Sequence, residues 1–124
     1  MDYVDSANAP KAIGPYSQAI KANGFVYTSG QTPLDPATGE MVQGAFEDQV
    51  HQVFRNLEAV LTAAGSSFGK VVKATVYVTD LANFQKLNTI YASYFGDHKP
   101  ARTTIQASGL PKGAQVEIDL VAGQ

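Results

Sequence analysis

The stretch KVVKATVYVTD, from Lys70 to Asp80, is typical of a β-strand with two different faces. Successive side chains of a strand point to opposite sides of the sheet. One side of this stretch would therefore be apolar and the other mixed: Val72, Ala74, Val76 and Val78 against Val71, Lys73, Thr75, Tyr77 and Thr79. We expect the apolar side to be covered by helices.

Segments with helical periodicity lie on both sides of this strand. Residues 45–65, AFEDQVHQVFRNLEAVLTAAG, repeat apolar residues every three or four positions, and Gly65 suits the helix end. Residues 81–95, LANFQKLNTIYASYF, do the same, with Asp80 as the expected cap and Gly96 at the end. The apolar sets are Phe46, Val50, Val53, Phe54, Leu57, Val60, Leu61 and Ala64 in the first, and Phe84, Leu87, Tyr91, Tyr94 and Phe95 in the second.

The remaining segments predict strands. SQAIKA and FVYTSG flank Asn23-Gly24, which favours a tight hairpin turn, and a loop rich in proline follows them. RTTIQAS and AQVEIDLVA close the chain. Two helices can cover only one face of such a sheet. The other face, with Thr75, Tyr77, Glu117 and Asp119, needs either water or another subunit over it.

Composition narrows the class of protein. The 124 residues fit one domain, residues 1–124, and the net charge is −2 without any cluster of lysine and arginine. Nucleic acid is therefore not an expected partner. The chain has no cysteine, which excludes disulfides and thiol catalysis. We see neither a signal peptide nor a membrane span, and we expect a cytoplasmic protein.

Two motifs are better explained by structure than by chemistry. Gly65–Gly69, GSSFG, matches the G-x-S-x-G nucleophile pattern, but a helix precedes it and a strand follows, which is the reverse of the required context. A helix end explains it better. Glu47 and His51 lie four residues apart on a helix without a third ligand, so we predict a solvated helix face and no metal site.

Arg102 and Glu117 are unusual because each interrupts an apolar strand. The chain has only two arginines, and a guanidinium at a strand start suits a two-point grip on a carboxylate. Glu117 falls out of phase with the apolar residues beside it and should point to the uncovered face. In a partly buried pocket it can act as an acid or base. A structural ion pair between the two residues is the alternative, and on the pattern alone it is modestly favoured.

Two further segments admit a local explanation and a functional one. Gly14-Pro15-Tyr16 is typical of a tight turn with an amphipathic packing residue. Ser29-Gly30 ends a strand, and glycine there either terminates the strand or lets a ligand approach the backbone.

Six blocks together resemble the YjgF/RidA family of reactive-intermediate deaminases: AIGPYSQAI, VYTSGQTPLDPATGEMV, QVFRNLEAVLTAAG, VVKATVYVTDLANFQKLNTIYASYF, PARTTI and LPKGAQVEIDLVA. The resemblance covers nearly the whole chain. It implies an α+β, chorismate-mutase-like fold, with a six-stranded mixed sheet and two helices on one face. It also implies a homotrimer whose other faces form a central barrel, with sites at the subunit interfaces.

The same resemblance implies an activity: hydrolysis of 2-iminobutanoate and 2-iminopropanoate to 2-oxo acids and ammonia, without a cofactor. Arg102 matches the residue that binds the substrate carboxylate, and Glu117 the residue that positions or activates water. The pocket-lining matches are Tyr16, Ser29, Gly30 and Asn88, with Phe84 as a candidate for side-chain preference. Thr104 stands where many members have cysteine; the family uses that position chiefly through its backbone.

Two other functions stay open at this point. A related hydrolase acting on 2-aminomuconate or another enamine would keep Arg102 but change the pocket around Tyr16 and Phe84. A chaperone-like or ribonuclease role would not need Arg102, and the lack of a basic stripe argues against RNA.

Overall fold

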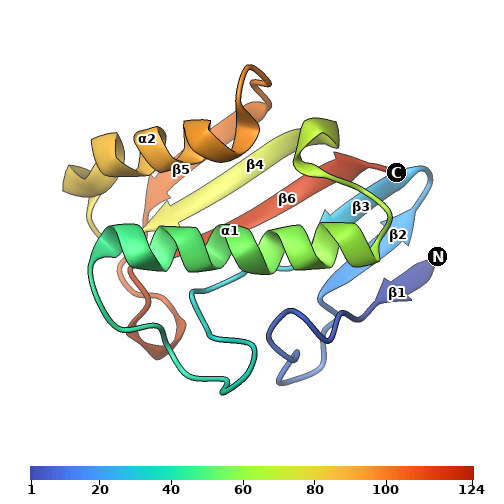
Figure 1. Cartoon of the computed structure of the whole chain (residues 1–124), viewed down its shortest axis with the longest axis horizontal. Helices are drawn as coiled ribbons and strands as arrows, with labels where there is room; N and C mark the ends of the chain where they lie inside the picture. The colour runs from blue at the N-terminus through green and yellow to red at the C-terminus, as the bar shows by residue number, and fades with distance from the viewer.

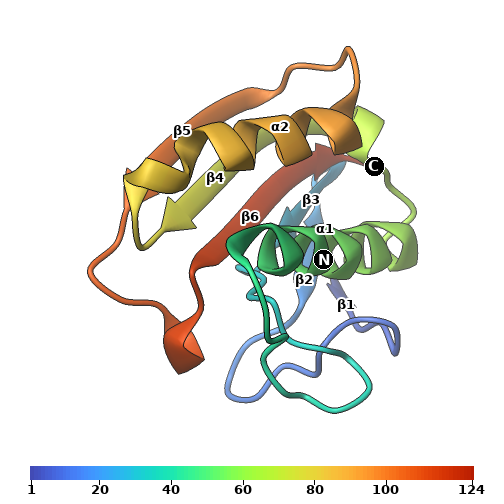
Figure 2. The same cartoon turned by 60° about the vertical axis from the view of Figure 1, so that its left-hand side comes forward.

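A computed structural model describes residues 1–124. One six-stranded mixed sheet carries two helices on the same side (Figures 1 and 2). The strand order is β1-β2-β3-β6-β4-β5, and only β4 and β5 run parallel. The elements are β1 (Asp2–Val4), β2 (Ala19–Ala22), β3 (Phe25–Thr28), α1 (Phe46–Ala63), η1 (Phe68–Lys70), β4 (Val71–Val78), η2 (Leu81–Asn83), α2 (Phe84–Phe95), β5 (Ala101–Gln106), η3 (Pro111–Gly113) and β6 (Val116–Gly123). The expected sheet and its helical layer are confirmed.

The first hairpin follows from its turn residues. Asn23 and Gly24 adopt φ values of 54° and 82°, in the left-handed region that this two-residue turn requires. β2 and β3 pair around them in the antiparallel register Ala22↔Phe25. The sequence did not indicate β1, which adds three residues at the sheet edge by pairing with β2.

The alternation expected along β4 holds except at its first two residues. Val71 is fully buried and Val72 is 48% exposed, the reverse of the expectation. The register against β6 shifts between Val71 and Lys73, so a β-bulge inserts one residue there and turns Val72 outward. From Lys73 onward the predicted faces are confirmed, because Ala74, Val76 and Val78 are all buried.

The second helix begins later than its apolar pattern suggests. Asp80 accepts a hydrogen bond from the Ala82 amide at 2.9 Å, but the turn that it caps is η2, and α2 itself starts at Phe84. Gly96 ends α2 with φ at 61°. The β4–α2–β5 connection then brings β5 back parallel to β4, as a helical crossover allows.

The core lies between the sheet and the two helices (Figure 2). All eight apolar residues expected on α1 are buried, and Phe54 lies at the centre of an aromatic cluster. Its ring stacks on Tyr94 at 4.5 Å and meets Tyr91 and Phe95 edge-on at 5.9 and 6.0 Å. The cluster fixes α2 against α1. Neither helix has the length and apolarity that crossing a membrane would need.

The opposite face of the sheet carries no helix (Figure 1). Tyr77, Glu117 and Asp119 are each partly buried there, as the alternation predicted. Large apolar side chains stand beside them: Tyr27 is 46% exposed and Ile105 is 45% exposed. A face that mixes half-buried carboxylates with large exposed apolar side chains is typical of a surface that another chain covers.

Asn56 of α1 holds the loop after β3. Its side chain is fully buried, and its amide donates to the carbonyls of Thr32 and Leu34 at 3.2 and 2.9 Å. We expect Asn56→Ala to lower the free energy of unfolding by about 1–3 kcal/mol, because it leaves buried carbonyls without a donor. Urea denaturation tests this, with Glu58→Ala on the exposed side of α1 as the control. Equal stabilities for the two variants would contradict it.

Candidate active site

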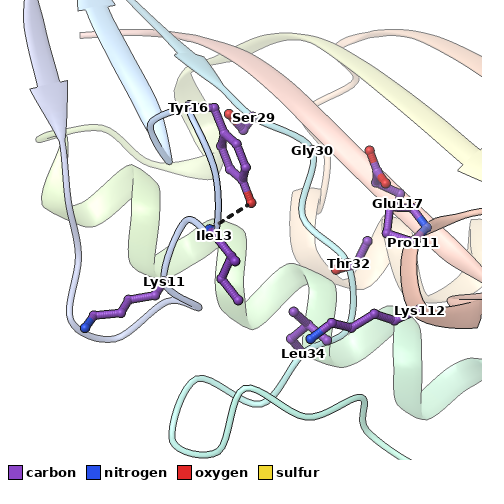
Figure 3. Close-up of a pocket in the computed structure, with 10 residues that line it drawn as sticks. All are labelled: Lys11, Ile13, Tyr16, Ser29, Gly30, Thr32, Leu34, Pro111, Lys112 and Glu117. Carbon is purple, nitrogen blue, oxygen red and sulfur yellow. Dashed lines mark hydrogen bonds between the residues drawn. The ribbon is translucent and has the colours of Figure 1, made fainter.

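Four of the predicted site residues line one cavity of about 490 Å³ (Figure 3). Tyr16 and Ile13 stand on one side, and Glu117, Pro111 and Lys112 stand on the other. The complete lining is Lys11, Ile13, Tyr16, Ser29, Gly30, Thr32, Leu34, Pro111, Lys112 and Glu117. We call this set the Glu117 cavity. It brings together residues from the first third of the chain and the last strand.

A pair of backbone hydrogen bonds places Gly30 beside Glu117. The Gln31 amide donates to the Ile118 carbonyl at 2.9 Å, and the Ile118 amide donates back to the Gln31 carbonyl at 3.2 Å. This bridge sets the end of β3 against β6. A Cβ built on Gly30 would overlap the Glu117 carboxylate. Glycine is required at this position by the close approach of Glu117, a reason that neither explanation offered for Gly30 had named.

Ser29 bonds to the loop that carries Tyr16. Its hydroxyl donates to the Ser17 carbonyl at 2.5 Å, and its amide donates to the Gln18 carbonyl at 2.9 Å. These bonds fix the Tyr16 loop to the end of β3. The Tyr16 ring remains 54% exposed, and its hydroxyl accepts a weak hydrogen bond from the Ile13 amide at 3.4 Å. The Tyr16 ring therefore faces the cavity, whereas Ser29 has a structural role through its hydrogen bonds to backbone carbonyls.

Burial raises the pKa of Glu117 above its ordinary value of 4.5, and the nearby Asp119 carboxylate raises it further. The two residues lie on the same face of β6, two positions apart. Burial likewise raises the pKa of Asp119, while hydrogen bonds from Tyr77 and Thr75 lower it. A carboxylate with a raised pKa is a better proton acceptor than an ordinary one, which suits general-base chemistry.

The other predicted residues gather elsewhere, between α2 and β5. The Arg102 guanidinium lies 5.4 Å from the centre of the Phe84 ring and 4.8 Å from the centre of the Tyr91 ring. Asn88 lies between these rings on the same helix face, one turn from each. Thr104 follows on the same side of β5. We call this group, Phe84, Asn88, Tyr91, Arg102 and Thr104, the Arg102 seam.

Three buried oxygens in the Arg102 seam have no hydrogen-bond partner within the chain: Asn88 Oδ1, Tyr91 Oη and Thr104 Oγ1. Buried polar atoms are nearly always paired, so three in one place are unusual. The Arg102 guanidinium can bind a carboxylate, and the three unpaired oxygens can accept hydrogen bonds from N–H or O–H groups of the same ligand.

Arg102 and Glu117 lie on opposite faces of the sheet. Arg102 pairs with Ala74, which pairs with Leu120, and both of these are buried beneath the helices. Glu117 pairs with Tyr77, which pairs with Ile105, on the uncovered face. The two charged groups therefore form no ion pair within one chain. The structural Arg102–Glu117 ion pair that the pattern favoured is wrong.

Tyr91 is a candidate site residue that the sequence did not single out, as are Lys11, Ile13, Thr32, Leu34, Pro111 and Lys112 of the Glu117 cavity. The sequence placed Tyr91 on the apolar side of its helix. This prediction is confirmed, because the Tyr91 ring packs on Phe95 with 4.5 Å between the ring centres. The available signal was its spacing of seven residues from Phe84 and three from Asn88, which places all three on one helix face. Spacing alone did not say that this face meets Arg102.

Of the two motifs set aside, GSSFG has the structural role expected of it, whereas His51 is half-buried between the helices and does not lie on the solvated face predicted for it. Gly65 has φ at 78° directly after α1, and the Ser66 hydroxyl donates to the Gly123 carbonyl at 2.5 Å. His51 Nδ1 lies 2.8 Å from the Tyr94 hydroxyl, so it ties α1 to α2. GSSFG is thus a helix end, and His51 is a link between the helices.

Comparisons with known proteins identify the family and the fold of this chain. A family model described as Endoribonuclease L-PSP matches residues 6–124. A RutC family protein of Pyrococcus horikoshii is 50% identical over 121 residues, which cover 98% of this chain and 96% of the relative. A bovine protein named 2-iminobutanoate/2-iminopropanoate deaminase is 44% identical, covering 98% and 88%. The crystal structure of a putative endoribonuclease from Thermotoga maritima superposes with a TM-score of 0.98 at 45% identity, covering 100% and 98%.

Proposed function

The chain belongs to the YjgF/RidA family, and from that premise we propose that it is a deaminase that hydrolyses 2-imino acids to 2-oxo acids and ammonia. The bovine relative's name supports the substrate class. The observation that carries the proposal is a pair of complementary half-sites. Arg102 is held against two aromatic rings on one surface, and Glu117 has a raised pKa beside Gly30 on another.

We further propose that the half-sites meet between copies of the chain, in a homotrimer. β5 is the edge strand of the sheet, so its Arg102 is within reach of a neighbouring chain. The uncovered face supplies the surface for contact, since it exposes Tyr27 and Ile105. In this arrangement the Arg102 seam of one copy closes the Glu117 cavity of the next, so each site contains one guanidinium and one catalytic carboxylate.

Arg102 has the chemistry to bind the substrate. Its planar fork donates two parallel N–H bonds to a carboxylate, and this fixes the adjacent C=N carbon in orientation as well as position. The guanidinium lies over the rings of Phe84 and Tyr91. The side chain of a short imino acid would then lie against Phe84 and Tyr16, which supply the apolar and aromatic surface of the two half-sites.

Glu117 has the chemistry to activate water. The carboxylate accepts a proton from water as the water oxygen bonds to the carbon of the protonated imine, and the C=N π electrons move to nitrogen to give a neutral carbinolamine. Glu117 then returns this proton to nitrogen. It takes the hydroxyl proton as the C–N bond breaks, which gives a 2-oxo acid and ammonia and leaves the proton on Glu117 for release to water. The Gly30 backbone lies against the Glu117 carboxylate, and we propose that its dipoles stabilise the charge that moves there.

The raised pKa of Glu117 predicts the pH profile. A general base works ionised, so kcat/KM should rise with pH through an inflection above the ordinary 4.5. Asp119→Asn removes one cause of the raised pKa, and its inflection should lie below that of the wild type. Rates measured from pH 4 to 8 test this. An unchanged inflection in Asp119→Asn would show that another group limits the rate.

Gly30→Ala should reduce activity with little effect on stability. The added Cβ overlaps the Glu117 carboxylate, which is the flexible end of a side chain and so moves aside. We expect a loss of roughly tenfold or more in kcat/KM, because small misplacements of a catalytic group are costly. Gly109→Ala is the matched control, since its Cβ meets nothing within 4 Å. Equal activities for the two variants would contradict the role of this close approach.

A coupled assay tests the proposed function. A threonine dehydratase generates 2-iminobutanoate, and formation of 2-oxobutanoate is followed with and without this protein. Faster formation that depends on Arg102 supports the proposal. A family hydrolase acting on 2-aminomuconate would show its higher kcat/KM on that substrate. A chaperone-like or ribonuclease activity would survive the loss of Arg102. No acceleration of imine decay would overturn the proposal.

A further inference from the structure

Tyr91 contacts the Arg102 guanidinium more closely than any other aromatic ring does, and nothing so far gives it a part in the reaction. Its ring centre lies 4.8 Å from the Arg102 Cζ, against 5.4 Å for Phe84. The ring is itself held from the core side by Phe95 at 4.5 Å and Phe54 at 5.9 Å. A fixed ring therefore supports the guanidinium of a long and otherwise flexible side chain.

The Tyr91 hydroxyl provides the second observation. It is buried and has no partner within the chain, like Asn88 Oδ1 beside it. Burial raises the pKa of Tyr91 and the Arg102 charge lowers it, so the phenol stays neutral at physiological pH and can accept an N–H bond. Arg102 donates to neither oxygen within the chain, so both stay free for a ligand, and Tyr91 contacts Arg102 through its ring.

A side chain on an edge strand would otherwise sample many rotamers, and fixing it on substrate binding would cost rotamer entropy. A ring under the guanidinium reduces this cost in advance. A cation over an aromatic ring is attracted by the ring's negative face, and more strongly where water is excluded. The contact also leaves the in-plane N–H groups of Arg102 free to bind a carboxylate.

We propose that Tyr91 is a positioning residue for Arg102: its ring sets the plane of the guanidinium before the substrate binds. This inference rests on the proposed function for its kinetic consequence. It names a residue that acts through Arg102 rather than on the substrate.

Kinetics separate the ring from the hydroxyl. Tyr91→Leu removes both and should raise KM roughly tenfold with kcat changed less, since a mobile guanidinium weakens binding of the carboxylate. Tyr91→Phe keeps the ring and should restore most of that loss. Tyr94→Leu is the matched control: it removes a tyrosine ring from the same helix and the same aromatic cluster, but one that contacts Phe54 and His51. Thermal unfolding of all three variants shows what each change does to the fold.

Magnetic resonance of the arginine side chains gives a readout that does not depend on activity. The chain has two arginines, so an ¹H–¹⁵N spectrum contains two Nε–Hε signals, and Arg55 on the outer side of α1 is the internal reference. The Arg102 signal should show an aromatic ring-current shift in the wild type and in Tyr91→Phe. That shift should diminish in Tyr91→Leu and persist in Tyr94→Leu.

The outcomes separate the two proposals. A shift lost only in Tyr91→Leu, together with a raised KM, supports the positioning role. If Tyr91→Leu shows this change in the Arg102 signal but the wild-type protein does not accelerate imine decay, the proposed function is overturned. The positioning of Arg102 by Tyr91 would still be supported. A Tyr91→Leu protein with an unchanged Arg102 signal and a KM within about twofold of the wild type would overturn this inference.

Discussion

Arg102→Ala is expected to lower kcat/KM for 2-iminobutanoate by roughly a hundredfold or more, because it removes two charge-assisted hydrogen bonds of about 1.5–3 kcal/mol each. Arg102→Lys keeps the charge but loses the planar fork, and we expect it to recover only part of the activity. Steady-state kinetics in the coupled assay give both values. The loss should be larger than that of any other single substitution in the Arg102 seam.

The control for this prediction is Arg55→Ala. Arg55 is the only other arginine and lies exposed on α1, so its loss changes the net charge equally without touching either half-site. Arg55→Ala should retain wild-type kinetics. If Arg102→Ala kept wild-type kcat/KM as well, substrate binding through the carboxylate would have to be assigned to another cation, such as Lys11 or Lys112 of the Glu117 cavity.

Glu117→Gln is expected to lower kcat by about 10²–10⁴-fold, the usual contribution of a general base, with a smaller change in KM. Glutamine has nearly the same shape, so the contact with Gly30 remains. Because unaided imine hydrolysis continues in water, the variant should approach the rate without protein. A kcat within a few-fold of the wild type would remove Glu117 from the mechanism.

Stability gives Glu117→Gln a second, independent readout. The pKa of Glu117 is higher in the folded protein than its ordinary value, so folding is disfavoured by its charge above that range. The neutral variant lacks this penalty and should be more stable than the wild type at pH 7. The difference should vanish as the pH falls below about 4, where the carboxyl is protonated in both states. Equal stability at pH 7 would mean that the charge is compensated in the native protein.

Periodicity was enough to predict most of this fold. The three- and four-residue spacing on α1 and the two-residue alternation on β6 each identify a buried face correctly, because those patterns follow directly from local geometry. The errors lie where one residue changes the register. The bulge at Val71–Val72 reverses two side chains, and β1 is too short to have a pattern of its own.

The candidate site was predictable as a set of residues but not as an arrangement. The unusual positions of Arg102 and Glu117 in apolar strands marked both of them. Their placement on opposite faces depends on the pairing of β4 with β5 and with β6, which no single strand encodes. The same is true of Tyr91. The sequence pattern of an apolar helix position is the same whether its neighbour in the fold is another aromatic ring or a guanidinium.

Activity of mixed assemblies tests most directly whether each site is shared between two chains. Arg102→Ala and Glu117→Gln chains, each inactive alone, are co-refolded in equal amounts and assayed. In a homotrimer with shared sites, about three quarters of the assemblies contain both kinds of chain. In each of these, one of the three sites combines an intact Arg102 from one chain with an intact Glu117 from its neighbour. About a quarter of wild-type activity should therefore return. If every site lay within one chain, every site would contain one of the two substitutions, and the mixture would stay inactive. That result would contradict the shared site.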